Sequence, residues 1–177
     1  MLALLFLGVA SCHNKIGNAN GIEIPDGVSM QLMKVDGCSF LYPSFLSEPK
    51  TTPGEETEMN REGHGVFVLN GSDLMNALVY DVRRVDNPYS KDAAEEFLEN
   101  LKKDEGSTLT NSQITDDGFV FDVEVLNPQV SLVKLYTTIA FKIKDKKSIT
   151  LTYTCTENNK EKMLAVKDAI VKSMEVE

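Results

Sequence analysis

The feature that most constrains the fold is a long region in which apolar and polar residues alternate. Runs with this period cover residues 119–126, 133–143 and 149–155. Successive side chains of a β-strand point to opposite sides of a sheet, so this period predicts strands with one buried and one wet side. Short turn sequences separate the runs, at Asp116-Asp117-Gly118, Asn127-Pro128 and Asp145-Lys146. Strands that follow one another through such turns predict an antiparallel meander.

Within this meander the alternation also predicts which side chains share a face. In the middle run we expect Val133, Leu135, Thr137, Ile139, Phe141 and Ile143 to share one face, opposite Lys134, Tyr136, Thr138, Lys142 and Lys144. In the last run we expect Ile149, Leu151, Tyr153 and Cys155 to face the core, with the threonines between them facing out. Earlier strands are predicted at residues 38–43, 65–70 and 76–84.

Two helices complete the predicted elements. Ser90 is a suitable N-cap, and it precedes an apolar stripe formed by Ala94, Phe97, Leu98 and Leu101. The second helix is predicted over 159–174, with Asn158 as its cap and Glu161 in the position of a capping box. The order of elements predicts an α+β class, an antiparallel meander β-sheet packed against two main helices, in a single domain at 30–177.

Residues 1–12 predict where the protein is located in the cell. Residues 1–11 are uncharged and mostly apolar, which has the length of a signal-peptide core and is too short to span a bilayer. Val9-Ala10-Ser11 before Cys12 resembles the lipobox of bacterial lipoproteins, in which the cysteine thiol receives the lipid. The leader lacks the usual Lys or Arg, which leaves a truncated N-terminus that happens to end in cysteine as the alternative.

Residues 12–29 are rich in Asn and Gly and predict a flexible tether between Cys12 and the domain. A lipid-anchored chain of this kind belongs in the bacterial cell envelope, facing the periplasm. His13, rather than Asp, follows the cysteine and favours the outer membrane. The net charge of −9 and the absence of a basic patch disfavour nucleic acid as a partner.

The sequence contains few residues that predict catalysis. His64 is a candidate general base or ligand, but no metal-ligand spacing surrounds it, and we interpret it as a solvated loop residue. No nucleophile elbow, phosphate-binding loop or calcium loop is present, and no cofactor is expected. Cys38 and Cys155 either form a disulfide in an oxidising periplasm or remain two buried thiols, and the sequence leaves both open.

Several elements together resemble the PsbP-like superfamily. Phe40-Leu41-Tyr42-Pro43-Ser44 is similar to its aromatic-x-Tyr-Pro element, and the helix after Ser90 takes the place of the helix between the early and late strands. The strands at 134–143 and 148–155, with the helix that ends at 169–174, resemble its long hairpin and terminal signature. The resemblance spans 30–174. It implies an adaptor or assembly factor, as in the Ran-binding import adaptor and the bacterial lipoproteins of this superfamily.

Two functions follow as expectations. The first is a membrane-anchored, non-catalytic module that binds an envelope protein through a sheet face or through the loop at 47–65. The second is a carrier of lipid or glycan, or an enzyme, with an apolar pocket between sheet and helices.

Overall fold

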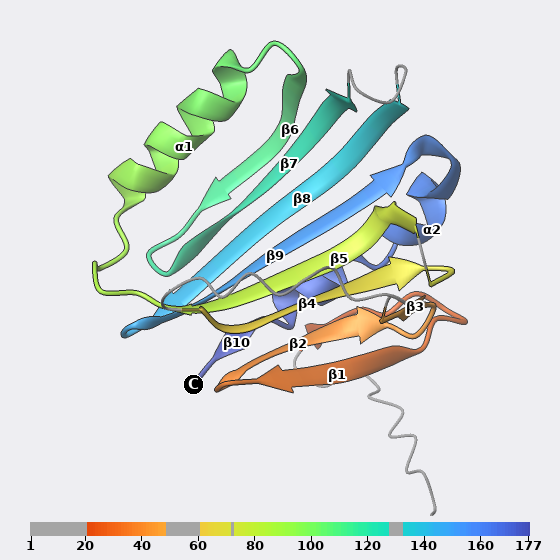
Figure 1. The fold of residues 1–177 in the computed structure, drawn as a ribbon, viewed down its shortest axis with the longest axis horizontal. Coiled ribbons are helices and arrows are strands. Elements are labelled where there is room, and N and C mark those ends of the chain that lie inside the picture. Colours follow the sequence, from red (N-terminus) through yellow and green to blue (C-terminus); the bar gives the residue numbers. More distant parts are fainter. Residues whose placement is uncertain (1–20, 49–60, 72, 128–132) are drawn as a thin grey trace, which may run out of the picture.

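The computed structural model describes residues 21–48, 61–71, 73–127 and 133–177. In this part of the chain the strands form two antiparallel sheets, one of seven strands and one of three. The large sheet is long and twisted, with helix α1 along one end of the strand order and the small sheet stacked near the other (Figure 1). The predicted α+β class is confirmed, whereas the single predicted sheet is in fact two.

The large sheet has the order β3-β4-β5-β9-β8-β7-β6, and the small sheet has the order β1-β2-β10. The strands of the large sheet are β3 (Leu46–Ser47), β4 (Arg61–Leu69), β5 (Asp73–Arg84), β9 (Lys147–Thr156), β8 (Val133–Lys144), β7 (Gly118–Asn127) and β6 (Ser107–Ile114). Those of the small sheet are β1 (Met30–Val35), β2 (Cys38–Pro43) and β10 (Glu175–Val176). The strands β7 to β9 form the predicted meander, β6 extends it by one strand, and the Asp145-Lys146 turn lies where it was expected.

Helix α1 (Lys91–Lys103) begins as the sequence predicts, because the Ser90 side chain accepts a hydrogen bond from the Ala93 amide at 3.1 Å. The predicted second helix is wrong in detail. It is divided into a 3₁₀ turn η2 (Glu157–Asn159), α2 (Lys160–Leu164) and α3 (Lys167–Lys172). Asn158 is not its cap: it lies inside η2, and no side-chain cap bond is formed at the start of η2 or α2.

The main core lies between the large sheet and a second layer made by the small sheet, α2 and α3. We call this side of the large sheet its core face. The side chains buried there include those of Leu78, Tyr80, Val82, Tyr136, Ala140, Ile149, Leu151, Tyr153 and Cys155. From the second layer, Phe40, Met163 and Ile170 enter this core with at most 1% of their surface exposed. Tyr153 donates a hydrogen bond to the Met163 carbonyl at 3.0 Å, which satisfies its buried hydroxyl.

The opposite side, which we call the α1 face, holds a separate apolar cluster. Directly opposed residues of neighbouring antiparallel strands share a face, and Phe119, Phe121 and Val123 are opposed to Phe141, Ile139 and Thr137. The Phe97 ring of α1 lies 5.8 Å from that of Phe119 and 5.9 Å from that of Phe121. Helix α1 therefore covers β6 and β7 on the side of the sheet away from the main core.

The two sets of β8 side chains predicted from alternation are confirmed, and the register shows which layer each set meets. Tyr136 is opposed to Cys155 and Ala140 to Leu151, so the core face receives Tyr136, Thr138 and Ala140. The more apolar set, which includes Ile139 and Phe141, lies on the α1 face. Alternation defines two sets of side chains in each strand, but only the register with β9 decides which set meets which layer.

The predicted tether overlaps the described residues at 21–29. There Ile22, Ile24 and Val28 are half-buried and pack against the main core. Contact with the domain therefore begins before Met30, which was the expected domain boundary. None of the helices in the described part of the chain has the length and apolar character that a bilayer crossing requires.

Candidate functional site

A groove runs along the core face where β6 and β7 extend beyond the cover of α3. We call it the α3 groove. Its floor is formed by β7 and β8, one wall by β6, and the other wall by the C-terminal helix and Met174 just after it. Lys167 and Val171 are four residues apart and lie on the same side of α3, with Lys167 bonded to Asp122 of β7 and Val171 lining the groove beside Met174.

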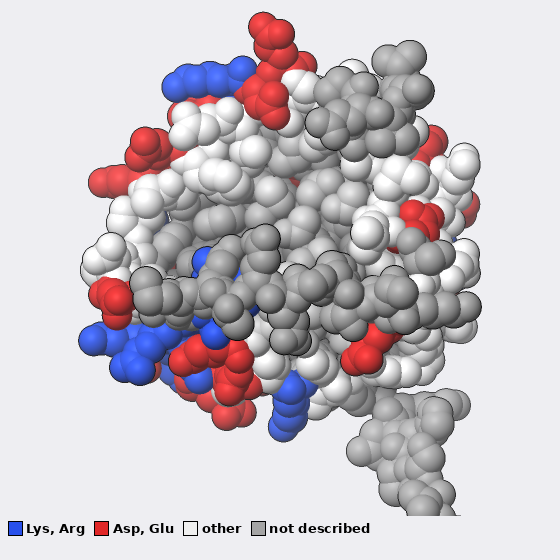
Figure 2. All heavy atoms as spheres, in the orientation of Figure 1, with Lys and Arg blue, Asp and Glu red and all other residues white. Residues whose placement is uncertain are grey.

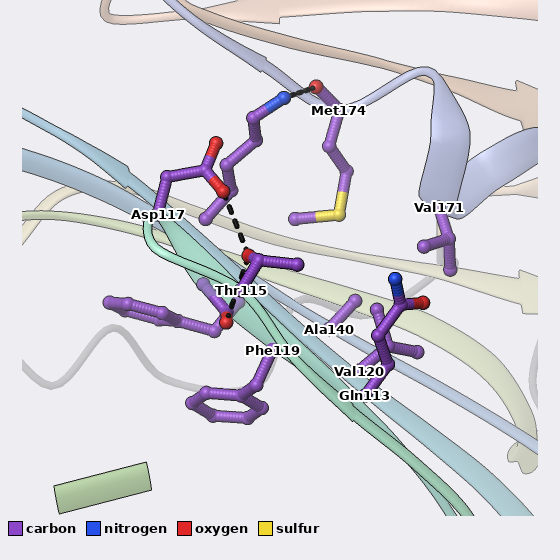
Figure 3. A pocket seen from close by; sticks show the side chains of 11 residues that line it. Gln113, Thr115, Asp117, Phe119, Val120, Ala140, Val171 and Met174 are labelled. Carbon is purple, nitrogen blue, oxygen red and sulfur yellow. Dashed lines mark hydrogen bonds between the residues drawn. The ribbon is translucent and has the colours of Figure 1, made fainter. Parts of the chain in front are cut away.

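The groove contains a cavity of about 150 Å³ that is open to the surface. Val171 and Met174 lie on one side of it, Gln113 and Val120 on another, and Thr115 and Asp117 near the β6–β7 turn (Figure 3). The lining residues are Gln113, Thr115, Asp117, Gly118, Phe119, Val120, Ala140, Phe141, Lys142, Val171 and Met174. Ligand pockets usually measure about 300–1,000 Å³, so this cavity has room for one side chain rather than for a lipid or a sugar chain.

Most polar groups around the cavity already have partners. The Lys142 ammonium donates a hydrogen bond to the Met174 carbonyl oxygen at 3.0 Å. The Thr115 hydroxyl lies 2.8 Å from a carboxylate oxygen of Asp117 and 3.1 Å from the Gly118 carbonyl oxygen (Figure 3). The Thr115 contacts hold the β6–β7 turn in place, and the Lys142 bond holds Met174 against β8. Because Gly118 is opposed to Lys142, the lysine and Asp117 lie at the same end of the apolar floor. Such an arrangement is able to orient a bound group.

A part-buried ion pair lies farther along the groove. The Lys167 ammonium of α3 is 2.8 Å from Asp122 of β7, which also accepts hydrogen bonds from Thr138 at 2.6 Å and Asn111 at 3.2 Å. Burial by itself raises the pKa of Asp122, but the bonds from Lys167 and Thr138 outweigh it and lower the pKa below its ordinary value. The pair joins the C-terminal helix to the sheet and fixes the width of the groove.

Replacing Asp122 by asparagine should lower the free energy of unfolding at pH 7 by about 1.5–3 kcal/mol, because Lys167 loses a charged partner. The pKa of Asp122 is lowered in the folded state, so its contribution is present above the unfolded pKa and is lost as the pH falls through the folded value. D122N should therefore flatten the loss of stability below about pH 4. Urea unfolding across a pH series measures both effects.

Asp168→Asn is the matched control for this measurement. Asp168 lies 3.7 Å from the same Lys167 ammonium but has 73% of its side chain exposed. Its replacement should change the free energy of unfolding by less than about 0.5 kcal/mol. Equal effects of the two substitutions would contradict a structural role for the Asp122–Lys167 pair.

His64 lies on β4 and does not line the cavity of the α3 groove. It is exposed on β4 and is opposed to Asp81 of β5. Asp81 accepts hydrogen bonds from Arg83 at 2.7 Å and Arg61 at 3.3 Å. Burial by itself raises the pKa of Asp81, but these two arginines lower it. The carboxylate is thus kept ionised and engaged by arginine. In the described ranges, no three side chains of His, Cys, Asp or Glu gather as a metal site.

The cysteines are placed as follows. Cys12 lies outside the described residues, so the predicted lipid attachment stays a prediction. Cys38 and Cys155 are both buried free thiols, and the disulfide alternative is wrong. Cys38 lies near Lys147 at the start of β9, whereas Cys155 is near the other end of the same strand. A disulfide requires Cα atoms within about 7 Å, and this separation is far larger.

These two thiols should be unreactive in the folded protein. Burial raises the pKa of Cys38 to about 11 and that of Cys155 to about 11, so little thiolate exists at neutral pH. In a Cys12→Ser variant, we expect an aromatic disulfide reagent to modify neither thiol before unfolding and both thiols in denaturant. Mass spectrometry that finds the pair already oxidised in freshly purified protein would contradict this placement.

The groove was not found by sequence reasoning. Its residues come from β6, β7, β8 and the C-terminal helix, and only the fold brings them together. One signal was present in the sequence, since Asp122 interrupts a predicted strand as a charged residue between Phe121 and Val123. Alternation placed it on the opposite side from these apolar residues, which is correct, but assigned that side to solvent.

Comparison with solved structures identifies the fold. The chain is similar to the solution structure of cyanobacterial PsbP (CyanoP) from Synechocystis sp. PCC 6803, with a TM-score of 0.59, 16% identity and coverage of 92% of this chain and 99% of that one. It is also similar to the Ran-binding protein Mog1p of Saccharomyces cerevisiae, with a TM-score of 0.51, 13% identity and coverage of 84% and 96%. A mutant form of Mog1 matches with a TM-score of 0.53 and 11% identity.

No protein-family profile matches the chain, and no curated protein matches its sequence. The structural matches therefore establish the fold and leave the family open. The chain has the α+β fold of PsbP and Mog1, built mostly of sheet, which confirms the fold that the resemblance at 30–174 implied.

Proposed function

We propose that this chain is a non-catalytic protein-binding module of a bacterial cell envelope, attached to the membrane by a lipid on Cys12. The observation that carries the binding role is the α3 groove. It is open, Lys142 and Asp117 lie at one end of its apolar floor, and its cavity of about 150 Å³ fits a single side chain. Protein interfaces concentrate their binding energy in a few anchor side chains that fill pockets of this kind.

The fold supports the same role. A protein of this fold, Mog1p, is named for binding Ran, which shows that the scaffold is able to present a protein-binding surface. The alternative role as a lipid or glycan carrier finds less support. Phe40, Met163 and Ile170 fill the space between sheet and helices with 0%, 0% and 1% of their surfaces exposed. The cavity at its margin is below the size of ordinary ligand sites.

The lipid anchor is supported by the sequence pattern at the N-terminus. An apolar stretch without charge is followed by Val9-Ala10-Ser11 and Cys12. A lipoprotein cysteine carries more than one acyl chain, and several chains hold a protein on a membrane firmly where one chain binds marginally.

The anchor is tested by expressing the full chain and its Cys12→Ser variant in a bacterium. We expect the wild-type chain in the membrane fraction, with a mass increase of several acyl chains on the peptide that begins at Cys12. The variant should leave the membrane fraction and carry no added mass. An unmodified Cys12 in the wild-type chain, with residues 1–11 still attached, would overturn the anchor and the envelope location together.

The binding surface is tested separately by photocrosslinking in the native host. A photoreactive residue at Gln113, at the edge of the cavity, is compared with one at Lys34, an exposed residue of β1 in the small sheet. We expect one reproducible protein adduct from Gln113 and none from Lys34, and competition by excess unlabelled chain should remove it. Adducts of equal yield from both positions, or from neither, would contradict binding through the α3 groove.

A further inference from the structure

The outer edge of β6 is open. β6 is the last strand of the large sheet, and in the described part of the chain no strand pairs with its outer side. Its sequence, STLTNSQI, holds no charge and no proline, and residues 110–113 are all exposed. Sheet edges are usually blocked by lysine, proline, a bulge or a covering helix. Here a bulge at Leu109–Asn111 and the contact with α1 are present, and the second half of the strand remains accessible.

The register shows which amides of β6 face outward. The Thr115 amide donates to the Gly118 carbonyl oxygen at 2.9 Å, which makes this the first hydrogen-bonded pair of the hairpin. Bonded and non-bonded pairs alternate along antiparallel strands. Gln113 therefore bonds to Val120, while Ser112 and Ile114 direct their amides away from β7. These outward groups have the spacing that an added strand requires.

Charge at the two ends of β6 selects the kind of strand that fits. Asp104 and Glu105 precede the strand and Asp117 follows it, and all three are exposed. Asp116, beside Asp117, is paired with Lys91 at 2.6 Å. Figure 2 shows acidic side chains along α1 and at its connection to β6, with basic side chains beside them at that connection. A second copy paired antiparallel would place each acidic end against the acidic end of its partner. With a net charge of −9 on each chain, that pairing is repelled.

We propose that the outer edge of β6 binds an extended segment of a partner protein as an added strand, with an uncharged middle and Lys or Arg at both ends. Backbone hydrogen bonds hold such a segment, and alternate side chains give selectivity. Gln113 belongs to this edge strand and also lines the cavity of the α3 groove (Figure 3). Side chains of the added strand that point to the core face therefore lie beside that cavity. This inference rests on the proposed protein-binding role and specifies where and how the partner docks.

The test uses the full chain, labelled for amide NMR, and two synthetic peptides of alternating threonine and valine. One peptide ends in lysines, and the matched peptide ends in glutamates. We expect the lysine peptide to shift and protect the amides of Ser112 and Ile114, with weaker binding at high salt, and the glutamate peptide to leave them unchanged. Ser112→Pro removes an outward amide without breaking the ladder to β7, and should weaken binding about tenfold. Ser112→Ala keeps the amide and should bind as the wild-type chain does.

Three results would overturn this inference. If the lysine peptide shifts Val171 and Met174 and leaves the β6 amides unchanged, the groove binds and the edge does not, and the proposed protein-binding role survives. If the chain associates with itself through β6 and Ser112→Pro abolishes that association, the occupant is a second copy. If Ser112→Pro and Ser112→Ala bind the peptide equally, no backbone pairing occurs. Unchanged amide spectra of Ser112→Pro away from β6 show that the variant is folded.

Discussion

Replacing Gly118 by alanine is expected to destabilise the protein by about 3 kcal/mol or to prevent folding. A Cβ atom at this position would lie 2.0 Å from the Phe141 carbonyl oxygen and 3.1 Å from the Lys142 Cα atom. Both atoms belong to the backbone of β8, so no side-chain rotation relieves the clash. The residue is glycine because β7 begins here in direct contact with its neighbour. Thermal and urea unfolding of G118A measure the loss.

Gly106→Ala is the matched control, in the connection between α1 and β6. There the nearest atom to an added Cβ is the Leu126 carbonyl oxygen at 3.5 Å, an ordinary contact. Alanine restricts the unfolded chain more than glycine does, so this substitution should leave stability unchanged or raise it by about 0.4–1 kcal/mol. The two substitutions add the same methyl group and should act with opposite sign. A wild-type melting temperature for G118A would contradict the register of β7 with β8.

The second large effect is expected for Phe121→Ala, with a loss of about 3–5 kcal/mol of unfolding free energy. The Phe121 side chain is fully buried, with 0% exposed, on the α1 face. Its ring stacks on that of Phe119 at 4.5 Å and contacts that of Phe97 at 5.9 Å. The substitution leaves a cavity between the sheet and α1, where backbone hydrogen bonds on both sides limit collapse. Chemical denaturation followed by circular dichroism measures the change.

Phe97→Ala is the comparison variant, because it removes a partly exposed ring of the same cluster. Phe97 is 39% exposed, so its removal takes away less buried area and should cost less than half as much as removal of Phe121. Similar losses for both variants would mean that α1 contributes its packing mainly through Phe97. A loss below about 1 kcal/mol for Phe121→Ala would contradict a second apolar layer on this side of the sheet.

Local patterns predicted the elements whose causes are local. Ser90 caps α1 through a contact with Ala93, three residues away, and the turn at Asp145-Lys146 needs only its own backbone. Alternation of apolar and polar residues over 119–155 likewise predicted the strands and their order. These features succeed because a cap, a tight turn and a two-residue period each depend on neighbours in the sequence.

The predictions from the sequence were wrong where contacts with a distant segment determine the local structure. β10 is a strand because Glu175 and Val176 pair with Ser39 and Cys38 of β2, and two residues carry no strand period of their own. The C-terminal helix is divided near Val166, whose side chain is 0% exposed in the main core. Packing at this point outweighs the continuous helical pattern that the sequence shows.

The sequence by itself therefore determined the α+β class, the meander, the start of α1 and the chemistry available to the chain. The tertiary structure alone decided which side of β8 meets the main core, and it alone joined Gln113, Lys142 and Met174 around one cavity. The physical reason is the pleat of a strand. The pleat separates two sets of side chains but does not determine which layer covers each set. The register of neighbouring strands and the helices packed on them determine this.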